Sequence, residues 1–191
     1  MTDQQRYSVE DRLGPIEIRR YAACVVADVV VGGSEESAGN RAFRPLVGYI
    51  GGRNRRSEAL AMTAPVLQAP AGESLAMTAP VLQEAGSGGT WVVSFVLPGD
   101  RLIDDYPEPL DPGVVLRSVP SEEAAALRWS GRWTAGNVER RRRELLAGLE
   151  GSPWHPAGPD RWARFDPPWR PAFLRRNEIV VPVRRDAVPP A

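Results

Sequence analysis

The sequence predicts an α+β protein in which a curved antiparallel sheet, or distorted β-barrel, carries two flanking helices. Runs of β-branched and alternating residues recur along the chain, as is typical of strands. Two segments with apolar residues at helical spacing interrupt these runs, one in each half of the chain. The order strand, strand, helix, strand, strand therefore occurs twice. It suggests two units, related by a pseudo-twofold axis, whose sheets join.

Length and composition indicate an ordinary globular domain. At 191 residues the chain is long enough for its own core, and we expect one domain over residues 1–191, with halves at about 16–83 and 114–183. The formal net charge is zero, so nothing global points to nucleic acid or to an anionic membrane. With one Cys and one His, the chain cannot form an internal disulfide or a Cys/His metal site, and we expect no metal.

The N-terminal segment is polar and lacks the apolar core of a signal peptide. No apolar run approaches the ~20 residues that a membrane-spanning helix needs. We therefore expect a cytoplasmic protein without a membrane span.

The first elements follow from local pattern. After a short extended lead-in at Tyr7–Val9, the segments Ile16–Tyr21 and Cys24–Val31 predict a pair of strands. Next comes a helix whose apolar face repeats at i, i+3, i+4 and i+7. Its Pro45 is tolerated if the helix begins near Asn40–Ala42, or it marks a kink, and Gly51-Gly52 ends the helix.

An eight-residue repeat follows the predicted helix. The octet AMTAPVLQ occurs at Ala61–Gln68 and again at Ala76–Gln83, and the residues between the copies favour a turn. We predict a β-hairpin with two near-identical arms. Pro65 and Pro80 each remove a ladder donor, so the arms should be edge strands or carry bulges. The alternative is a recent local duplication inside a purely structural hairpin.

The rest of the chain alternates strands with loops and one helix. Trp91–Leu97 predicts the clearest single strand, and Pro98–Pro112 predicts a surface loop. The second half is expected to contain strands at Val114–Val119, Ala125–Trp133, Trp162–Phe165 and Glu178–Val183, and a helix at Thr134–Leu149.

The residues give little support to catalysis, and we predict no catalytic residue. A nucleophile with a histidine base would have to use His155, which lies in a Pro-rich loop with no acid before Asp160. Asp104 and Asp105 are neighbours in a loop and point apart in an extended chain. Glu178 opens the last predicted strand; it either faces water at a ladder edge or lines a pocket.

Several motifs together resemble the SOUL haem-binding protein family, and the duplicated hairpin resembles its bacterial branch. The matching segments are IEIRRY, AFRPLVGYIGGRN, the doubled AMTAPV, FVLP, YPEPLDPGV and FDPPW…FLRRNEIVVPV. The resemblance implies a distorted β-barrel with two helices and binding of haem or a related tetrapyrrole by a non-enzymatic carrier, buffer or sensor.

The resemblance also implies where a tetrapyrrole would lie, on an apolar surface at the first helix with basic side chains at its propionates. The residues that it implies are Phe43, Leu46, Val47 and Ile50 on the helix, Met62 and Met77 in the hairpin, and Arg53, Arg55 and Arg56 after the helix. A family member has a proposed axial His near the start of this helix, but this chain has none there. We expect that His155, in the other half, is not an axial ligand.

Two other functions compete with tetrapyrrole binding. The duplicated unit is similar to gyrase-inhibitor-like effector-binding domains, which bind, and in some cases hydrolyse, small amphipathic or cationic molecules at the junction of their halves. Here Trp91, Trp129, Trp133 and Trp169 with Glu178 would form that alternative pocket, because aromatic faces suit cations. The third function is a protein-interaction module that uses an exposed apolar helix groove.

Overall fold

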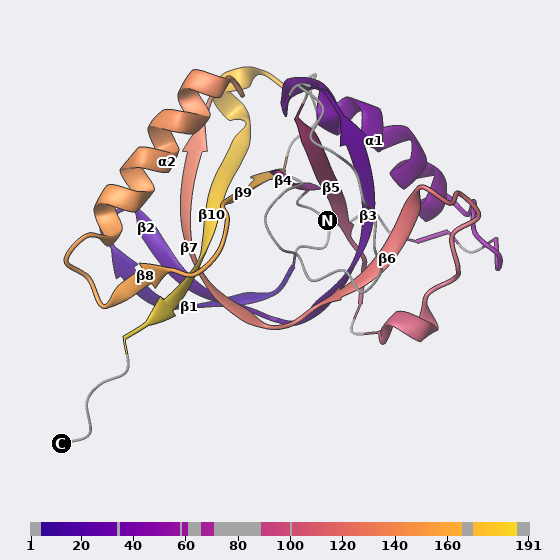
Figure 1. Ribbon diagram of the computed structural model, residues 1–191, viewed down its shortest axis with the longest axis horizontal. Helices are drawn as coiled ribbons and strands as arrows, with labels where there is room; N and C mark the ends of the chain where they lie inside the picture. The colour runs from indigo at the N-terminus through magenta and orange to yellow at the C-terminus, as the bar shows by residue number, and fades with distance from the viewer. Residues whose placement is uncertain are drawn as a thin grey trace.

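The protein folds into a curled antiparallel sheet that forms a half-barrel, with a helix packed on the outside of each wall (Figure 1). The structure is a computed structural model, and it describes residues 5–33, 35–57, 59–60, 66–70, 89–99, 101–165 and 170–186. We call the other side of the sheet, which faces the interior of the half-barrel, the inner face.

Ten strands and two α-helices are described. In chain order they are β1 (Tyr7–Leu13), β2 (Ile16–Tyr21), β3 (Cys24–Gly32), α1 (Glu35–Ile50), β4 (Val66–Pro70), β5 (Thr90–Val96), β6 (Val114–Val119), β7 (Glu122–Ser130), α2 (Ala135–Leu149), β8 (Trp154–Pro156), β9 (Arg161–Arg164) and β10 (Arg176–Arg185). Two short 3-10 helices, η1 (Ile103–Asp105) and η2 (Ala172–Leu174), lie in loops. Among the described helices, none has the length and apolar character to cross a bilayer.

The order of the strands is symmetric. The sheet runs β1-β2-β7-β10-β9-β4-β5-β3-β6, and β8 pairs with β10. Without β1 and β8, exchanging β2 with β6, β3 with β7, β4 with β9 and β5 with β10 gives the same order read from the other end of the sheet. Each half therefore places its first strand in the wall of the other half. This arrangement confirms the predicted α+β fold, in which a curved antiparallel sheet carries two flanking helices.

The predicted pairing of the first two strands is wrong. β2 pairs with β1 and β7, whereas β3 pairs with β5 and β6. The connection Ala22-Ala23 lacks the Gly, Asn or Asp that a tight reversing turn needs. The chain instead continues from one wall of the half-barrel into the other (Figure 1).

The prediction of edge strands is wrong for the described part of the first hairpin arm. β4 pairs with both β5 and β9 and is thus an interior strand. The strand begins directly after Pro65 and ends at Pro70, so the interior of its ladder is free of proline. The second arm, together with Met62 and Met77, lies outside the described residues.

Both predicted helices are confirmed, with one change of boundary. α1 begins at Glu35 and contains Pro45, so the alternative in which the helix begins near Asn40–Ala42 is wrong. Its end is as predicted: the helix stops at Ile50, before Gly51-Gly52, and Gly52 adopts a φ of 100°. α2 starts after Thr134, whose side chain accepts a hydrogen bond from the backbone N–H of Asn137 at 3.3 Å.

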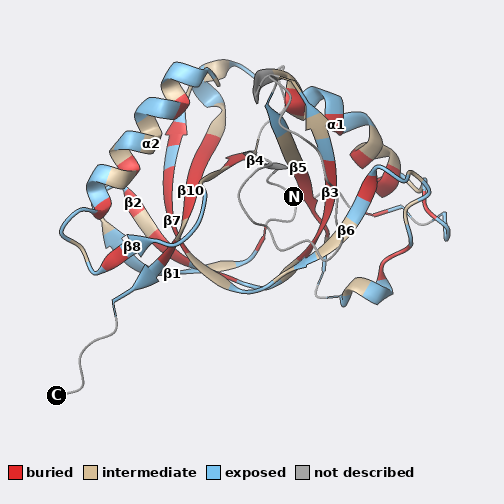
Figure 2. Cartoon of the chain, in the orientation of Figure 1, coloured by how far each residue is buried: buried red, intermediate tan, exposed pale blue. Residues whose placement is uncertain are grey.

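Two apolar cores lie between the sheet and the helices (Figure 2). One joins α1 to β3 and β5, and the other joins α2 to β2, β7 and β10. Alternate residues of each strand face these cores or the inner face, as the period of two requires. On the inner face, Tyr21, Ala124, Ala126 and Val180 form a third, smaller cluster. Buried positions on both faces leave little room for an unpaired charge.

Candidate functional site

The apolar residues implied for the first helix differ in their access to a ligand. Leu46 is fully buried and Ile50 is 7% exposed, and both belong to the core beneath α1. Val47 packs partly against the same core. Phe43 is 46% exposed, and its ring meets Phe95 edge to face with 6.1 Å between centroids. Among these four helix residues, Phe43 offers the most open side chain.

The implied arginines gather where α1 ends. Arg53, Arg55 and Arg56 are all exposed. Arg55 forms an ion pair with Glu108, and its backbone N–H donates to the carbonyl of that residue at 2.9 Å. The guanidinium of Arg56 donates to the carbonyl of Asp105 at 2.9 Å. These contacts hold the segment against the loop before β6 and keep three cations at the negative end of the helix dipole.

Four tryptophans form a continuous cluster on the helix side of the sheet. Trp129 stacks on Trp133 with centroids 5.6 Å apart, and Trp133 meets Trp162 at 6.0 Å. Trp162 in turn contacts Trp91 at 5.4 Å. Because Trp91 packs against both main cores, the cluster joins the two halves. The structure thus brings together three of the tryptophans predicted for the alternative pocket.

Glu178 does not join this cluster. In the β7–β10 ladder Glu178 lies opposite Arg128, and Asn177 lies opposite Trp129. Neighbouring residues of a strand point to opposite faces, so Glu178 is on the inner face and Trp129 on the helix side. The predicted combination of indole rings with Glu178 is therefore split by the sheet. Trp169 lies outside the described residues.

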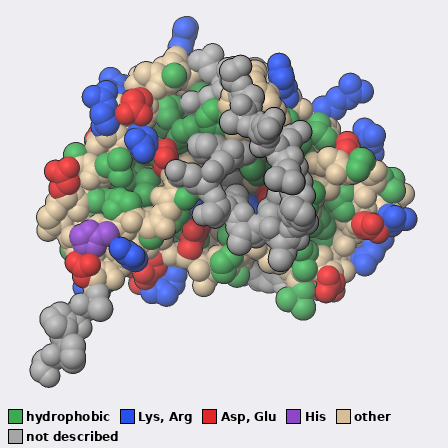
Figure 3. Space-filling view, viewed as in Figure 1, with side chains coloured by type: hydrophobic (Ala, Val, Ile, Leu, Met, Phe, Trp, Pro, Cys, Tyr) green, Lys and Arg blue, Asp and Glu red, His purple; other side chains and the backbone are tan. Residues whose placement is uncertain are grey.

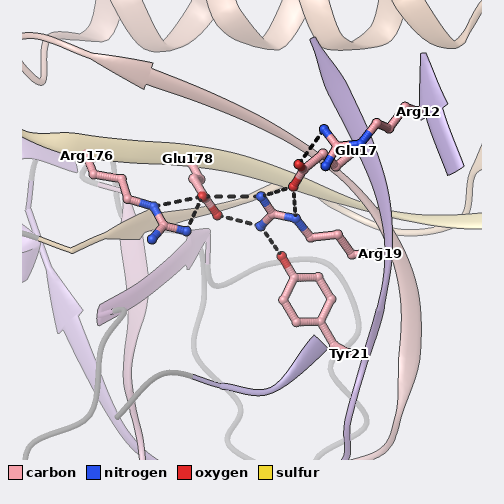
Figure 4. A network of polar contacts seen from close by, with 6 residues as sticks. All are labelled: Arg12, Glu17, Arg19, Tyr21, Arg176 and Glu178. Atoms are coloured by element: carbon pink, nitrogen blue, oxygen red, sulfur yellow. Dashed lines mark hydrogen bonds and ion pairs between the residues drawn. The ribbon is translucent and has the colours of Figure 1, made fainter. Parts of the chain in front are cut away.

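A buried ionic network surrounds Glu178 on the inner face (Figure 4). Glu178 is 1% exposed, and its carboxylate accepts hydrogen bonds from Arg19 at 2.7 Å and from Arg176 at 2.7 Å. Arg19, 3% exposed, also pairs with Glu17 at 2.7 Å and donates to the Tyr21 hydroxyl at 2.9 Å. Arg12 extends the network by pairing with Glu17 at 2.8 Å. Every charge in the network thus has an opposite charge in direct contact.

The surroundings shift the pKa values of three of these groups, Arg19, Tyr21 and Glu17. Burial opposes the charge of Arg19, but the hydrogen bond to Glu178 and its attraction outweigh burial and raise the pKa of Arg19. Burial raises the pKa of Tyr21, so its hydroxyl stays neutral. For Glu17, burial is outweighed by Arg19 and Arg12, which lower its pKa. Both carboxylates of the network, Glu17 and Glu178, are thus engaged by arginines, and removing one member would leave a buried charge without its partner.

A second ion pair lies on the inner face of the opposite wall. Arg117 donates to Asp28 at 2.7 Å. Arg117 occupies the fourth position of β6, as Arg19 does in β2, and the two strands are exchanged by the symmetry of the sheet order. Each arginine therefore reaches across from its own half to an acid of the other half. The two pairs tie the halves together reciprocally.

Cys24 lies on the same face of β3 as Asp28, because four residues separate them in the strand. Burial raises the pKa of its thiol to about 11, so the group is protonated at neutral pH. The side-chain amide of Gln5 lies 3.4 Å from its sulfur. A protonated, partly buried thiol is a poor nucleophile and a poor metal ligand.

Sequence reasoning missed the partners of Glu178, although one signal was present. In β10 the residues that follow Glu178, Ile179–Val181, are apolar at consecutive positions, which indicates a strand buried on both faces. A carboxylate in such a strand needs a cationic partner. The identity of that partner, Arg19, could not be read locally because it lies 159 residues away in sequence.

No group of three or more His, Cys, Asp or Glu side chains that could hold a metal ion is found in the described part of the chain. His155 lies on β8 and pairs with Asp186 at 2.8 Å. Figure 3 shows its side chain on the lower left of the molecule, below α2, whereas α1 lies on the right. His155 is therefore remote from the implied helix surface.

Solved structures share this fold at low sequence identity. The C-terminal domain of EcmrR matches with a TM-score of 0.63 and 12% identity, covering 94% of this chain and 98% of that one. An uncharacterized conserved protein from Listeria innocua matches with a TM-score of 0.62 and 12% identity, covering 88% and 92%. A hydrolase from Listeria innocua matches with a TM-score of 0.54 and 11% identity, covering 88% and 91%. At such identities the likeness concerns the fold alone.

The sequence comparisons identify the family. No curated protein matches the chain at a significant level. The model of the SOUL heme-binding protein family, however, matches residues 2–182, which is nearly the whole chain. The chain therefore belongs to the SOUL haem-binding protein family.

Proposed function

We propose that this protein binds haem or a related tetrapyrrole without transforming it, as a carrier, buffer or sensor. The observation that carries the proposal is the family match over residues 2–182. The ion pairs that occupy Glu17 and Glu178 on the inner face agree with a binding role rather than with acid–base catalysis.

The second half of α1 and the segment that follows it offer side chains that suit such a ligand. A tetrapyrrole such as haem combines a flat apolar ring with two carboxylates. Phe43 offers an exposed aromatic ring, and Arg53, Arg55 and Arg56 offer guanidinium groups that pair with carboxylates. Leu46 and Ile50 would support this surface from the core rather than touch the ligand. The ligand would thus be held by one aromatic contact and by ion pairs near water.

Such a surface predicts modest affinity. Exposed ion pairs contribute little, about 0–1 kcal/mol each. A strong axial ligand would add much more, but His155 is remote from α1. We expect a dissociation constant of about micromolar or weaker.

The alternative of a cationic ligand at Glu178 finds less support. Two arginines already neutralise this carboxylate, which is 1% exposed. An organic cation would have to displace both guanidinium groups and leave one of them buried without its partner. The tryptophan cluster is on the other side of the sheet and cannot assist at that position.

A haemin titration followed at the Soret band tests the proposal, with wild type compared with His155→Ala. We expect a saturable spectral change with the same midpoint and band shape in both proteins. If no saturable change occurs, the protein does not bind haem. If His155→Ala abolishes a sharp six-coordinate spectrum, the site lies in the second half of the chain instead.

A further inference from the structure

The end of α1 turns the chain back over the helix. The backbone N–H of Arg53 donates to the carbonyl of Gly48 at 2.9 Å, and that of Gly52 donates to the carbonyl of Tyr49 at 3.2 Å. With Gly52 at a φ of 100°, these two hydrogen bonds form a Schellman motif. The backbone of Arg53 is therefore fixed beside the last turns of the helix.

Gly48 leaves room on the helix surface for the side chain of Arg53. A Cβ atom at position 48 would lie 3.2 Å from Cδ of Arg53 and 3.5 Å from its Nη1. The guanidinium group thus lies close against the helix, in space that a larger residue at position 48 would claim. The carbonyls of Gly48 and Tyr49 already accept hydrogen bonds, so they repel an anion less than free carbonyls at a helix end would.

Arg44 lies next to this guanidinium group. It precedes Gly48 by four residues in α1, so the two positions are neighbours on one helix face, with about 5–6 Å between Cβ positions. Arg44 and Arg53 are both exposed. Neither side chain forms a hydrogen bond or an ion pair in the described part of the chain. Two guanidinium groups are therefore available within one helical turn.

The other arginines of this surface are engaged. Arg41, Arg55 and Arg56 each contact a backbone carbonyl or a carboxylate. To bind a ligand through their guanidinium groups, these residues would have to give up contacts that Arg44 and Arg53 do not have. Available cations and engaged cations thus lie side by side at the end of α1.

Apolar side chains lie beside the available pair. Phe43, 46% exposed, precedes Arg44, and Val47 follows Phe43 by one helical turn and is partly exposed. Since Leu46 and Ile50 face the core, Phe43 and Val47 lie between the core and Arg44 on the surface of the helix. A flat apolar group over these two side chains would have Arg44 at its edge.

We propose that Arg44 and Arg53 together bind one carboxylate of the tetrapyrrole, whose ring lies over Phe43 and Val47. We call this pair the carboxylate clamp. The inference rests on the proposed function and adds Arg44, which the family resemblance did not imply. Guanidinium groups suit this role because each presents paired N–H donors in a planar fork. The bound carboxylate then fixes the orientation of the ring on the helix.

Soret titrations with haemin and with its dimethyl ester, which lacks free carboxylates, test the clamp. We expect wild type to bind haemin about tenfold more tightly than the ester. Arg44→Gln and Arg53→Gln should each weaken haemin binding about threefold, and the double variant about tenfold, because exposed ion pairs are individually weak. The affinity for the ester should stay the same in all three variants.

Two further variants sharpen the test. Arg184, exposed on β10 opposite His155, also has no side-chain partner among the described residues. Arg184→Gln removes an equal charge far from α1 and should bind both compounds as wild type does. Gly48→Leu keeps both cations but fills the space over which Arg53 lies, so it should weaken haemin binding about as much as Arg53→Gln. Circular dichroism checks that each variant keeps its helices.

Three results would contradict the clamp and leave tetrapyrrole binding in place. They are equal affinity of wild type for haemin and the ester, a preference for haemin that survives in the double variant, and a loss in Arg184→Gln as large as in Arg44→Gln. The absence of a saturable change with either compound would overturn the proposed function, and the clamp with it.

Discussion

At the scale of single residues, the inner face shows how buried charge is kept stable. Arg19 and Glu178 are each almost inaccessible to water, and each has lost its hydration. Their mutual hydrogen bonds, together with Arg176, Glu17 and Tyr21, replace that hydration. A charge left alone in this position would be costly.

The substitution Glu178→Gln tests this balance. It removes the carboxylate and leaves Arg19 buried without its main partner. We expect the free energy of unfolding, measured by urea denaturation, to fall by about 3–5 kcal/mol. The control Glu123→Gln breaks the pair with the exposed Arg20 and should cost less than about 1 kcal/mol. Equal losses in both variants would show that the network does not behave as a buried unit.

Cys24 gives a prediction on pH. Burial raises the pKa of its thiol from 9.0 to about 11. The unfolded chain therefore loses this proton before the folded chain does. The thiol contributes stability that is fully present below pH 9 and is lost as the pH rises toward 11.

The variant Cys24→Ala lacks this titration. We expect its free energy of unfolding to decline less than that of the wild type between pH 9 and 11 in urea titrations. Identical slopes in the two proteins would mean that the thiol titrates alike in the folded and unfolded chains.

At the scale of elements, the apolar residues of α1 divide into buried ones that pack on the sheet and an exposed one that a ligand can contact. Leu46 faces the core with no exposed area, whereas Phe43 is nearly half exposed. The helical periodicity predicted that both residues lie on the same apolar face. It could not predict how far the sheet covers that face, because the cover comes from strands elsewhere in the sequence.

Matched alanine substitutions test this division. Leu46→Ala should lower the free energy of unfolding by about 2–5 kcal/mol because it leaves a cavity. Phe43→Ala should cost about 1 kcal/mol or less but weaken haemin binding, since it removes the exposed ring. Urea denaturation and the Soret titration measure the two effects. Unchanged haemin affinity in Phe43→Ala would remove α1 from the site.

The strands show where local pattern succeeds and where it fails. Runs such as Cys24–Val31 and Trp91–Leu97 correctly predicted strands, because β-branched and aromatic residues suit a pleated, buried surface. Pairing was predicted wrongly for β2 with β3, and position was predicted wrongly for β4. Which strands pair depends on contacts between segments that are distant in sequence. The sequence of one strand alone does not show these contacts.

At the scale of the whole molecule, the exchange of β2 and β6 makes the halves interdependent. The repeated order of elements predicted two related units in one α+β fold. The order did not predict that the first strand of each unit pairs with a strand of the other unit. These first strands, β2 and β6, carry Arg19 and Arg117, which form ion pairs with acids of the other unit. This exchange also explains why the charged side chains of the inner face find their partners across the halves.

A fragment ending at residue 113 tests this interdependence. It would lack β6 and β7, so β3 and β2 would each lose a pairing partner. We expect far-UV circular dichroism and amide dispersion in NMR spectra to show an unfolded fragment. A folded monomeric fragment would mean that the first half is an independent unit.

The central claim is that a tetrapyrrole binds on the outer surface formed by the second half of α1 and the segment that follows it. The most direct test is NMR mapping of the amide shifts of the full chain during titration with gallium protoporphyrin IX, a diamagnetic analogue of haem. The account predicts saturable shifts concentrated at Phe43, Arg53 and Arg55. Shifts concentrated instead at inner-face residues such as Ala126 and Val180, or the absence of saturable shifts, would contradict it.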